Sequence, residues 1–320
     1  MKNNLKKAFS LIEISIVILV VGVLIAGISR GLKMAHSEMI LVTAKSLTDK
    51  APVPNVEGLE LWLETTSENS LAIGTTSFVN IKKPEDGQPI GRWNDLNPMA
   101  LNSSYKNHAL QATSNYQPLY MKDGINGLPA LLFDGADDYI ASTTKFITNN
   151  FTVFVVGFPI IKTSCDLSAS ITAGVSGQRY IVYPQQGDVI FPSNNAASAG
   201  VSLCTNFIAG FEHGNGYMPY VVSNTRTVNK PIQITLKYSI GIPKLYLNST
   251  DSYSRSASGK NIFPGLTFGG GRPRVPTNYG EDYGYFKGYI GEIIVYSKDL
   301  SDTDRKLIET YLIEKWRIKI

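Results

Sequence analysis

Three carboxylates crowd into five residues of this chain, at Asp134, Asp137 and Asp138 around Gly135. Hard cations such as calcium prefer oxygen ligands of this kind, which makes the cluster a candidate calcium site. The same spacing is typical of turns in which aspartate oxygens accept hydrogen bonds from nearby backbone amides. We expect the turn in preference to calcium, and we expect no other cofactor.

A second pair of carboxylates, Glu60 and Glu64, would lie on one face of a strand and raises the question of glycoside hydrolysis. Four residues of strand separate the two by about 13 Å, whereas retaining and inverting glycosidases hold their carboxyl groups roughly 5 to 9.5 Å apart. His36, His108 and His213 show neither a metal-ligand spacing nor a paired nucleophile. We therefore interpret both glutamates as surface residues and do not expect an enzyme.

Aromatic rings and charged donors are mixed between Gly271 and Lys287, a composition that suits sugar recognition. Rings stack on the apolar faces of pyranoses while polar groups hold the hydroxyls. Tyr285 and Phe286 have a second interpretation, in which they begin the last strand and pack in its core. The candidate ligand-binding residues of this loop are Arg272, Arg274, Tyr279 and Tyr283.

Residues 9–28 form a run of twenty almost wholly apolar positions, preceded by a basic leader with Lys2, Lys6 and Lys7. As a helix this run covers about 30 Å, enough to cross the hydrocarbon core of a bilayer, and it is longer than the apolar segment of a secretory signal. Glu13 interrupts the run with a carboxylate that costs a few kcal/mol in lipid and is normally retained for a partner. The segment therefore predicts a permanent anchor in which Glu13 needs a counter-charge.

The stretch Lys7-Ala8-Phe9-Ser10-Leu11-Ile12-Glu13 resembles the processing site of type IV prepilins and pseudopilins. The resemblance implies that prepilin peptidase cuts between Ala8 and Phe9, that Phe9 is methylated, and that its freed amino group pairs with Glu13 of a neighbouring subunit. Two charges that are each poorly solvated in the membrane would then be satisfied only across an interface. The chain departs from the family at Ala8, where glycine is usual, and at Arg30, where major pilins often carry a kinking proline.

An ordinary signal anchor is the alternative interpretation, since it needs neither Phe9 nor Glu13 and is oriented by the leader lysines alone. Both interpretations keep the N-terminus in the cytoplasm and place the rest of the chain beyond a bacterial inner membrane. Cys165 and Cys204 would then lie where oxidation is permitted. We expect a disulfide between them, with two buried free thiols as the alternative.

The chain is predicted to divide into a leader at 1–8, a helix at 9–50, a linker at 51–57 that contains Pro52 and Pro54, and a separate globular head at 58–320. Short β-branched and aromatic runs between turn residues predict an all-β sandwich for the head. A final helix is capped by Ser301, and its apolar face is predicted to comprise Leu307, Ile308, Tyr311, Leu312 and Trp316. The expected strands are Leu59–Leu63, Ala130–Phe133, Val153–Phe158, Tyr180–Tyr183, Ile232–Tyr238, Lys244–Leu247 and Gly291–Tyr296.

Several segments of the head look like bacterial laminin G-like modules of the concanavalin A-like superfamily, among them Gly58-Leu59-Glu60-Leu61-Trp62-Leu63, Trp93-Asn94-Asp95-Leu96, Asn126-Gly127-Leu128-Pro129-Ala130 and Gly291-Glu292-Ile293-Ile294-Val295-Tyr296. The resemblance implies a two-sheet jelly roll, and some relatives bind calcium on a rim. The glucanases of this superfamily place three carboxylates on one strand. Glu292 lies in the best local match and lacks the other two, which also disfavours hydrolysis.

Two functions from different classes follow. In the first, the chain is a minor pilin or pseudopilin of a type IV pilus or type II secretion-like filament, whose head serves adhesion or binds glycans or proteins. In the second, the helix tethers a periplasmic lectin-like or glycan-hydrolysing head that joins no filament. The formal net charge of +4 includes the three leader lysines, and no concentrated basic face is evident. We therefore expect no nucleic-acid partner.

Overall fold

The computed structural model describes residues 11–100, 106–142, 148–160, 165, 178–192, 195–215, 218–270 and 284–320. An apolar N-terminal helix is followed by an antiparallel β-sandwich and a C-terminal helix, which confirms the predicted fold class. The short helices of the described part of the chain are η1 (Val53–Asn55), η3 (Ser114–Tyr116) and α2 (Gly187–Ile190).

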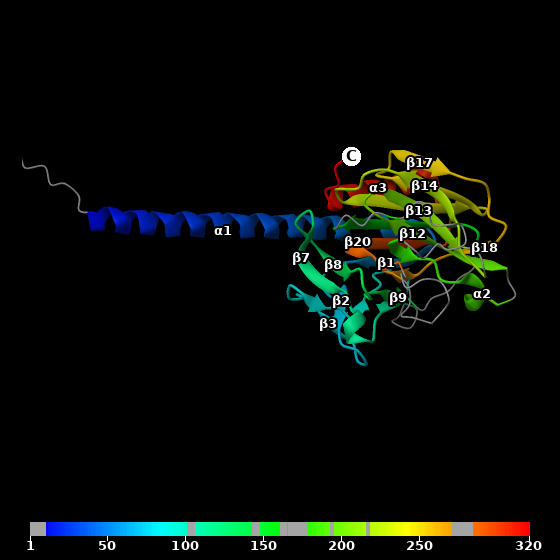
Figure 1. Cartoon of the computed structure of the whole chain (residues 1–320), viewed down its shortest axis with the longest axis horizontal. Helices are drawn as coiled ribbons and strands as arrows, with labels where there is room; N and C mark the ends of the chain where they lie inside the picture. Colours follow the sequence, from blue (N-terminus) through cyan, green and yellow to red (C-terminus); the bar gives the residue numbers. More distant parts are fainter. Residues whose placement is uncertain are drawn as a thin grey trace, which may run out of the picture.

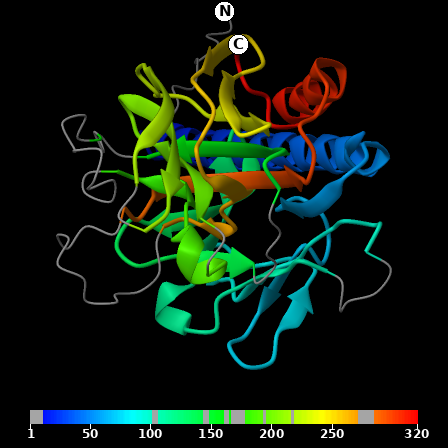
Figure 2. The same ribbon diagram turned by 90° about the vertical axis from the view of Figure 1, so that its right-hand side faces the viewer.

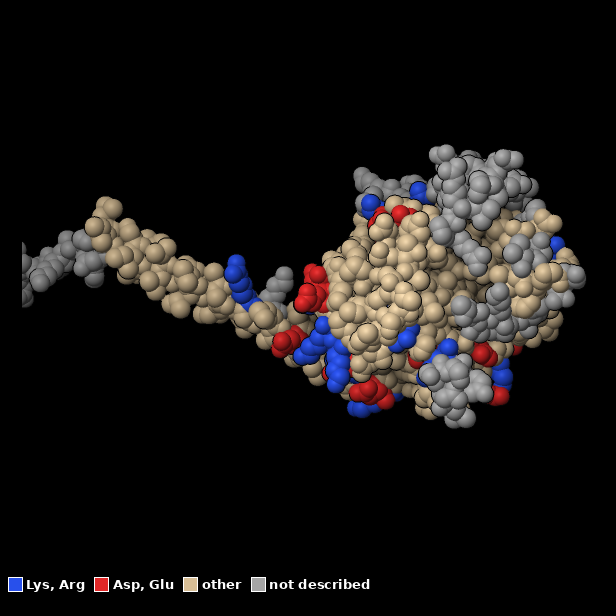
Figure 3. Space-filling model, turned by 90° about the horizontal axis from the view of Figure 1, so that it is seen from below, with Lys and Arg blue, Asp and Glu red and all other residues tan. Residues whose placement is uncertain are grey.

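The N-terminal helix α1 (Leu11–Asp49) is continuous over 39 residues and projects from the head (Figure 1). Every side chain described between residues 11 and 39 is exposed. We call this part of α1 the stalk, and at 1.5 Å per residue it extends about 43 Å. Among the described residues, one helical segment is long and apolar enough to cross a membrane, and it begins within the stalk, at Ile14. Figure 3 shows that the stalk is nearly free of charged residues until it approaches the head.

Nine described strands form the first sheet, sheet A, in which β1 (Leu59–Glu64) pairs with β20 beside the main order. In spatial order the other strands are β17 (Asp251–Ser254), β16 (Ile242–Leu247), β15 (Ile232–Ser239), β10 (Phe151–Pro159), β20 (Lys287–Tyr296), β8 (Leu128–Asp134), β7 (Leu119–Ile125) and β4 (Gln88–Pro89).

The second sheet, sheet B, has eleven described strands, and β18 (Asn261–Pro264) pairs with β12 in parallel beside the main order. In spatial order the others are β14 (Tyr220–Thr225), β13 (Phe207–His213), β12 (Ala196–Leu203), β11 (Tyr180–Tyr183), β19 (Thr267–Phe268), β9 (Ile140–Ser142), β6 (Ala109–Leu110), β5 (Arg92–Trp93), β2 (Leu71–Ile73) and β3 (Val79–Ile81). Each of the seven strands expected from the sequence lies within a strand of the structure.

The main core lies between the two sheets, and β15 shows how the sequence pattern builds it. Ile234, Leu236 and Tyr238 point into this core. The intervening Gln233 and Thr235 are also buried, on the opposite face of the strand. Successive side chains of a strand point to opposite faces, so the two sets of residues are buried on the two sides of sheet A. Both faces of sheet A are therefore covered at this point.

The C-terminal helix α3 (Asp302–Lys315) covers the outer face of sheet A together with the end of α1 (Figures 1 and 2). Ser301 caps α3 as predicted, because its hydroxyl accepts a hydrogen bond from the Asp304 amide. The predicted apolar face is wrong at Leu307, which is 48% exposed. The buried stripe of α3 instead includes the ion pair between Arg305 and Glu309, which turns Leu307 toward solvent.

The segment predicted as a linker is part of the packed interior. Ala51, Val53 and Val56 are buried in a second hydrophobic cluster on the outer face of sheet A, and Ala44 of α1 belongs to the same cluster. The phenol of Tyr296 donates a hydrogen bond to the Val53 carbonyl at 2.8 Å. The expectation of a separate globule on a short link is therefore corrected. These apolar side chains are buried by packing on the sheet, and this packing fixes the helix to the head.

Candidate functional site

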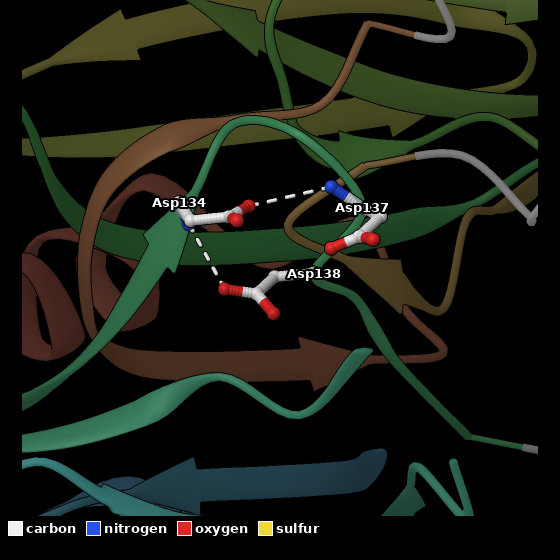
Figure 4. Close-up of side chains that lie close together, drawn as sticks. All are labelled: Asp134, Asp137 and Asp138. Atoms are coloured by element: carbon white, nitrogen blue, oxygen red, sulfur yellow. Dashed lines mark hydrogen bonds between the residues drawn. The ribbon is translucent and has the colours of Figure 1, made fainter. Parts of the chain in front are cut away.

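The three clustered aspartates lie on the connection from β8 in sheet A to β9 in sheet B (Figure 4). The amide of Asp134 donates to Asp138 at 3.0 Å, and the amides of Ala136 and Asp137 donate to Asp134 at 2.7 and 3.3 Å. These are the hydrogen bonds expected of an aspartate-closed turn. One carboxylate oxygen from each residue lies within 4.8 Å of the other two, so the group has the spacing to share a cation. The turn is therefore formed as expected, and calcium stays the untested alternative.

The three carboxyl groups differ in how deeply they are buried. Asp134 is exposed and Asp137 is half-buried, whereas Asp138 is buried. Burial, reinforced by the neighbouring Asp134, raises the pKa of Asp138 to about 7. The same two causes raise the pKa of Asp137. Near neutral pH the Asp138 carboxyl is therefore partly protonated, whereas an exposed aspartate would have released its proton.

Beside this turn, a row of aromatic rings crosses the outer face of sheet B, the face opposite the main core. We call it the tyrosine band. It was not predicted, because its members come from six separate segments and share no spacing along the chain. Only the strand alternation and the order of the strands in the sheet bring them together. The band comprises Tyr116, Tyr139, Tyr180, Tyr183, Phe211, Tyr220 and Tyr285.

Glu60 and Glu64, the two carboxylates considered for glycoside hydrolysis, were both expected on the surface, and neither is fully exposed. Glu60 is half-buried and accepts a hydrogen bond from Ser297 at 2.7 Å. Glu64 was predicted to be a surface residue and is fully buried. The Lys315 ammonium donates to Glu64 at 3.0 Å and to Glu292 at 2.8 Å, and all three side chains are inaccessible to solvent. The prediction for Glu64 was wrong because its partner comes from α3, far along the chain.

The buried Glu64–Lys315–Glu292 group is closely hydrogen-bonded. The indoles of Trp62 and Trp316 each donate to Glu292 at 2.8 Å. Burial alone would raise the pKa of Glu64, but the Lys315 ammonium and nearby amide and hydroxyl donors hold it below its usual value. Burial opposes the charge on Lys315 too, yet the two carboxylates raise the pKa of its ammonium. These shifts favour the ionised forms of Glu64 and Lys315 inside the protein.

Cys165 and Cys204 form a disulfide, as predicted, with 5.7 Å between their Cα atoms. Both cysteines are buried in a small cluster on the outer face of sheet B, which also contains Tyr180 and Phe211. The disulfide therefore fixes residue 165 beside the tyrosine band.

Among the described residues, the two histidines of the head, His108 and His213, make contacts with the backbone. The Asp95 amide donates to Nδ1 of His108 at 3.0 Å, and burial, followed by the nearby Arg92, lowers the pKa of that imidazole. Nδ1 of His213 lies 2.8 Å from the Pro184 carbonyl. Neither contact forms part of a metal-ligand set.

The remaining predicted site residues lie outside the described part of the chain. They are the processing residues Ala8 and Phe9 and the loop residues Arg272, Arg274, Tyr279 and Tyr283. For Glu13 the structure describes the backbone, which is helical, but not the side chain. Tyr285 and Phe286, the two aromatic residues with a second interpretation, are both buried, and Phe286 belongs to the main core.

The fold defines a β-sandwich protein with one N-terminal apolar helix. No protein-family model matches the chain. No curated protein matches it either.

Among solved structures, domain 4 of the arabinanase AbnA from Geobacillus stearothermophilus, in complex with arabinotriose, is 14% identical, with a TM-score of 0.43 over 79% of this chain and 97% of that domain. The botulinum neurotoxin serotype C1 binding domain is 11% identical, with a TM-score of 0.44 over 81% of this chain and 53% of that one. A Trypanosoma rangeli sialidase is 12% identical, with a TM-score of 0.41, and the match covers 33% of its length.

Proposed function

We propose that this chain is a pilin-like subunit, a minor pilin or pseudopilin, that enters a type IV pilus or type II secretion-like filament and displays its β-sandwich head for adhesion or binding. The main observation that supports this proposal is the stalk. It is an apolar helix with one acidic residue near its start, and its described side chains are exposed up to residue 39. Such a surface requires either lipid or other helices around it.

The joint between helix and head supports the same function. Ala44 and Thr48 near the end of α1 are buried in the head, so the end of α1 is packed into the head and the stalk continues from it as the same helix. A subunit that moves from membrane to filament needs its head to follow the helix in a fixed orientation. A flexible tether would not require that α1 end inside the hydrophobic cluster.

In this proposal the head lies on the periplasmic side of the inner membrane, or on the cell surface once the subunit is in a pilus. The leader would be cut between Ala8 and Phe9 by prepilin peptidase. The new amino group at Phe9 would pair with Glu13 of the adjacent subunit, which satisfies both charges in the apolar filament core. The large head favours a low-copy position, because many copies would crowd the filament surface.

We further propose that the head does not hydrolyse glycans. Lys315 brings Glu64 and Glu292 close together, but both carboxylates are fully buried and share its ammonium. A glycosidase needs one carboxyl group that donates a proton and a second that reaches the sugar.

The test is the replacement Glu13→Ala in cells that express the full chain and its filament machinery. Membrane insertion should persist, because the change makes the apolar run more hydrophobic. Incorporation into sheared filaments should fall by roughly tenfold or more, because the Phe9 amino group loses its counter-charge. Quantitative immunoblotting of sheared and membrane fractions measures both.

Glu38→Ala is the matched control, since Glu38 is an exposed carboxylate of the same helix outside the apolar run. It should leave incorporation unchanged. Mass spectrometry of the mature N-terminus should find methylated Phe9. An intact Met1 together with equal incorporation of both variants would leave only the tethered head.

A further inference from the structure

The turn between β15 and β16 carries an isoleucine in a backbone conformation that β-branched residues rarely adopt. Ser239 pairs with Ile242 across the two strands, so Ile240 and Gly241 form a two-residue loop. Their φ values are 50° and 75°. Loops of this kind favour Asn-Gly, because a β-branched side chain at positive φ is strained. The Ile240 side chain is 78% exposed, so packing inside the head does not account for its presence.

Hydrogen bonds from neighbouring segments hold this turn in place. The Ile240 amide donates to the Asn150 side chain at 2.6 Å, and the Gly241 amide donates to the Asn149 carbonyl at 3.0 Å. The Ser258 amide donates to the Gly241 carbonyl at 2.9 Å. Strained residues persist only where surrounding contacts fix them, and they are concentrated at binding and switch sites. The turn therefore presents Ile240 to solvent in one fixed conformation.

The turn lies at the end of the head that is opposite the stalk. Beside the turn, the Ser239 hydroxyl donates to Asp299 at 2.6 Å, just before α3 begins. At the other end of α3, the Trp316 carbonyl accepts a hydrogen bond from Asn126, in the hairpin that approaches α1. The 14 residues of α3 cover about 21 Å at 1.5 Å each. In the proposed function, Ile240 is therefore displayed away from the membrane that holds the stalk.

A second apolar side chain and two basic ones belong to the same part of the head. Ile242 of β16 is 39% exposed, and the exposed Lys244 lies on the same face of that strand, two residues further on. The neighbouring strand β17 is followed by Arg255, which is also exposed. Residues 240–262 contain three basic residues and one acidic residue. We call Ile240, Ile242, Lys244 and Arg255 the isoleucine tip, which combines apolar side chains with positive charge.

We infer that the isoleucine tip binds the surface of an anionic lipid bilayer, with Ile240 inserted among the lipids and Lys244 and Arg255 at the phosphates. The inference rests on the proposed function, because it gives the displayed head a partner for adhesion. Burial of an apolar side chain and attraction between basic residues and anionic lipids both favour binding at such a surface. A protein pocket is disfavoured, because it would match the isoleucine alone, whereas a bilayer also supplies phosphates to the flanking bases.

Binding is tested with the full chain reconstituted in phosphatidylcholine nanodiscs, which enclose the stalk and leave the head free. Surface plasmon resonance measures the association of these discs with supported bilayers of phosphatidylcholine, either alone or with one quarter phosphatidylglycerol. Empty discs are the blank. Discs that carry the chain should bind the anionic bilayer about fivefold or more tightly than the neutral one, and about 0.5 M NaCl should remove most of this difference.

Ile240→Asn should weaken binding to the anionic bilayer about tenfold or more, because it removes the inserted side chain. It should also raise the urea midpoint of the chain, since Asn-Gly is the preferred pair in this loop. Loss of affinity without loss of stability separates a binding role from a structural one. Lys244→Ala should weaken binding about fivefold, on the anionic bilayer only.

Val79→Asn is the matched control, because Val79 is a 61% exposed apolar residue on the edge strand of sheet B, and its affinity should stay within about twofold of the wild type. Binding no stronger than that of empty discs, an equal loss in the control, or a lower urea midpoint in Ile240→Asn would each overturn the inference. Association of the discs with one another through Ile240, without bilayer binding, would identify a second copy as the partner and also overturn it. Glu13→Ala should bind the bilayer normally, so a failure of filament assembly and a failure of bilayer binding are separate results.

Discussion

At the scale of single residues, Asp138 shows how burial changes the chemistry of a side chain that the sequence presents as an ordinary turn residue. Its carboxyl group accepts the Asp134 amide and is buried beside a second carboxylate. The pKa of Asp138 is therefore raised to about 7 from a usual value of 3.8. A raised pKa in the folded state means that folding favours the protonated form.

The stability of the head should therefore depend on pH through Asp138. The contribution of the protonated carboxyl is fully present below about pH 4 and is lost as the pH rises through about 7. Asp138→Asn keeps an oxygen that accepts the Asp134 amide and carries no charge. We expect it to raise the urea midpoint at pH 8 and to have little effect at pH 4.

Urea titrations of the solubilised chain at both pH values measure this difference. Asp123→Asn is the control, because Asp123 is an exposed carboxylate on the β7–β8 hairpin. A chelator should not change the wild-type midpoint if the turn is closed by backbone amides alone. A calcium-dependent rise at pH 8 that Asp138→Asn abolishes would instead show that the three aspartates bind the metal.

At the scale of elements, the β7–β8 hairpin holds the two helices where the stalk leaves the head. Asn126 and Gly127 form its tip with φ values of 51° and 86°. The Asn126 side chain donates to the carbonyls of Trp316 and Arg317 at the end of α3. A Cβ atom built on Gly127 would lie 3.3 Å from Ile40 of α1. The glycine therefore permits both the turn and the close approach of α1.

Gly127→Ala should destabilise the chain by about 1 kcal/mol and loosen the end of α1, because it strains the turn and presses on Ile40. Gly87→Ala separates these effects, since Gly87 has a φ of 79° and an added Cβ would meet nothing within 4 Å. Both variants should lose similar stability in urea. Only Gly127→Ala should speed amide hydrogen exchange at residues 40–48, and equal exchange in the two would show that the contact with Ile40 is unimportant.

At the scale of the whole molecule, one buried polar group connects the end of α1, sheet A and the last helix. The hydroxyl of Thr48 in α1 lies 3.4 Å from that of Thr66, which donates to Glu64 in β1. Glu64 pairs with Lys315 of α3, and Lys315 pairs with Glu292 of β20. The direction of the stalk is therefore set by the same contacts that hold α3 on the sheet.

Lys315→Met should destabilise the whole chain by about 3 to 5 kcal/mol, because it leaves two carboxylates buried without their shared ammonium. Denaturation by urea at pH 7 measures the loss. Lys319→Met is the control, since Lys319 is exposed near the same end of the chain, and it should change little. A loss below about 1 kcal/mol for Lys315→Met would mean that the carboxylates become protonated and need no cation.

The sequence by itself determined the apolar helix, the sandwich class, the capped C-terminal helix, the aspartate turn and the disulfide. Each depends on local periodicity, on capping and turn chemistry, or on there being only two cysteines to pair. The tertiary structure alone decided that Glu64 is buried, that Ala51, Val53 and Val56 of the predicted linker belong to a core, and that the tyrosine band exists. These features join residues far apart in the chain, and strand order and helix packing, which no local pattern encodes, bring them within contact distance.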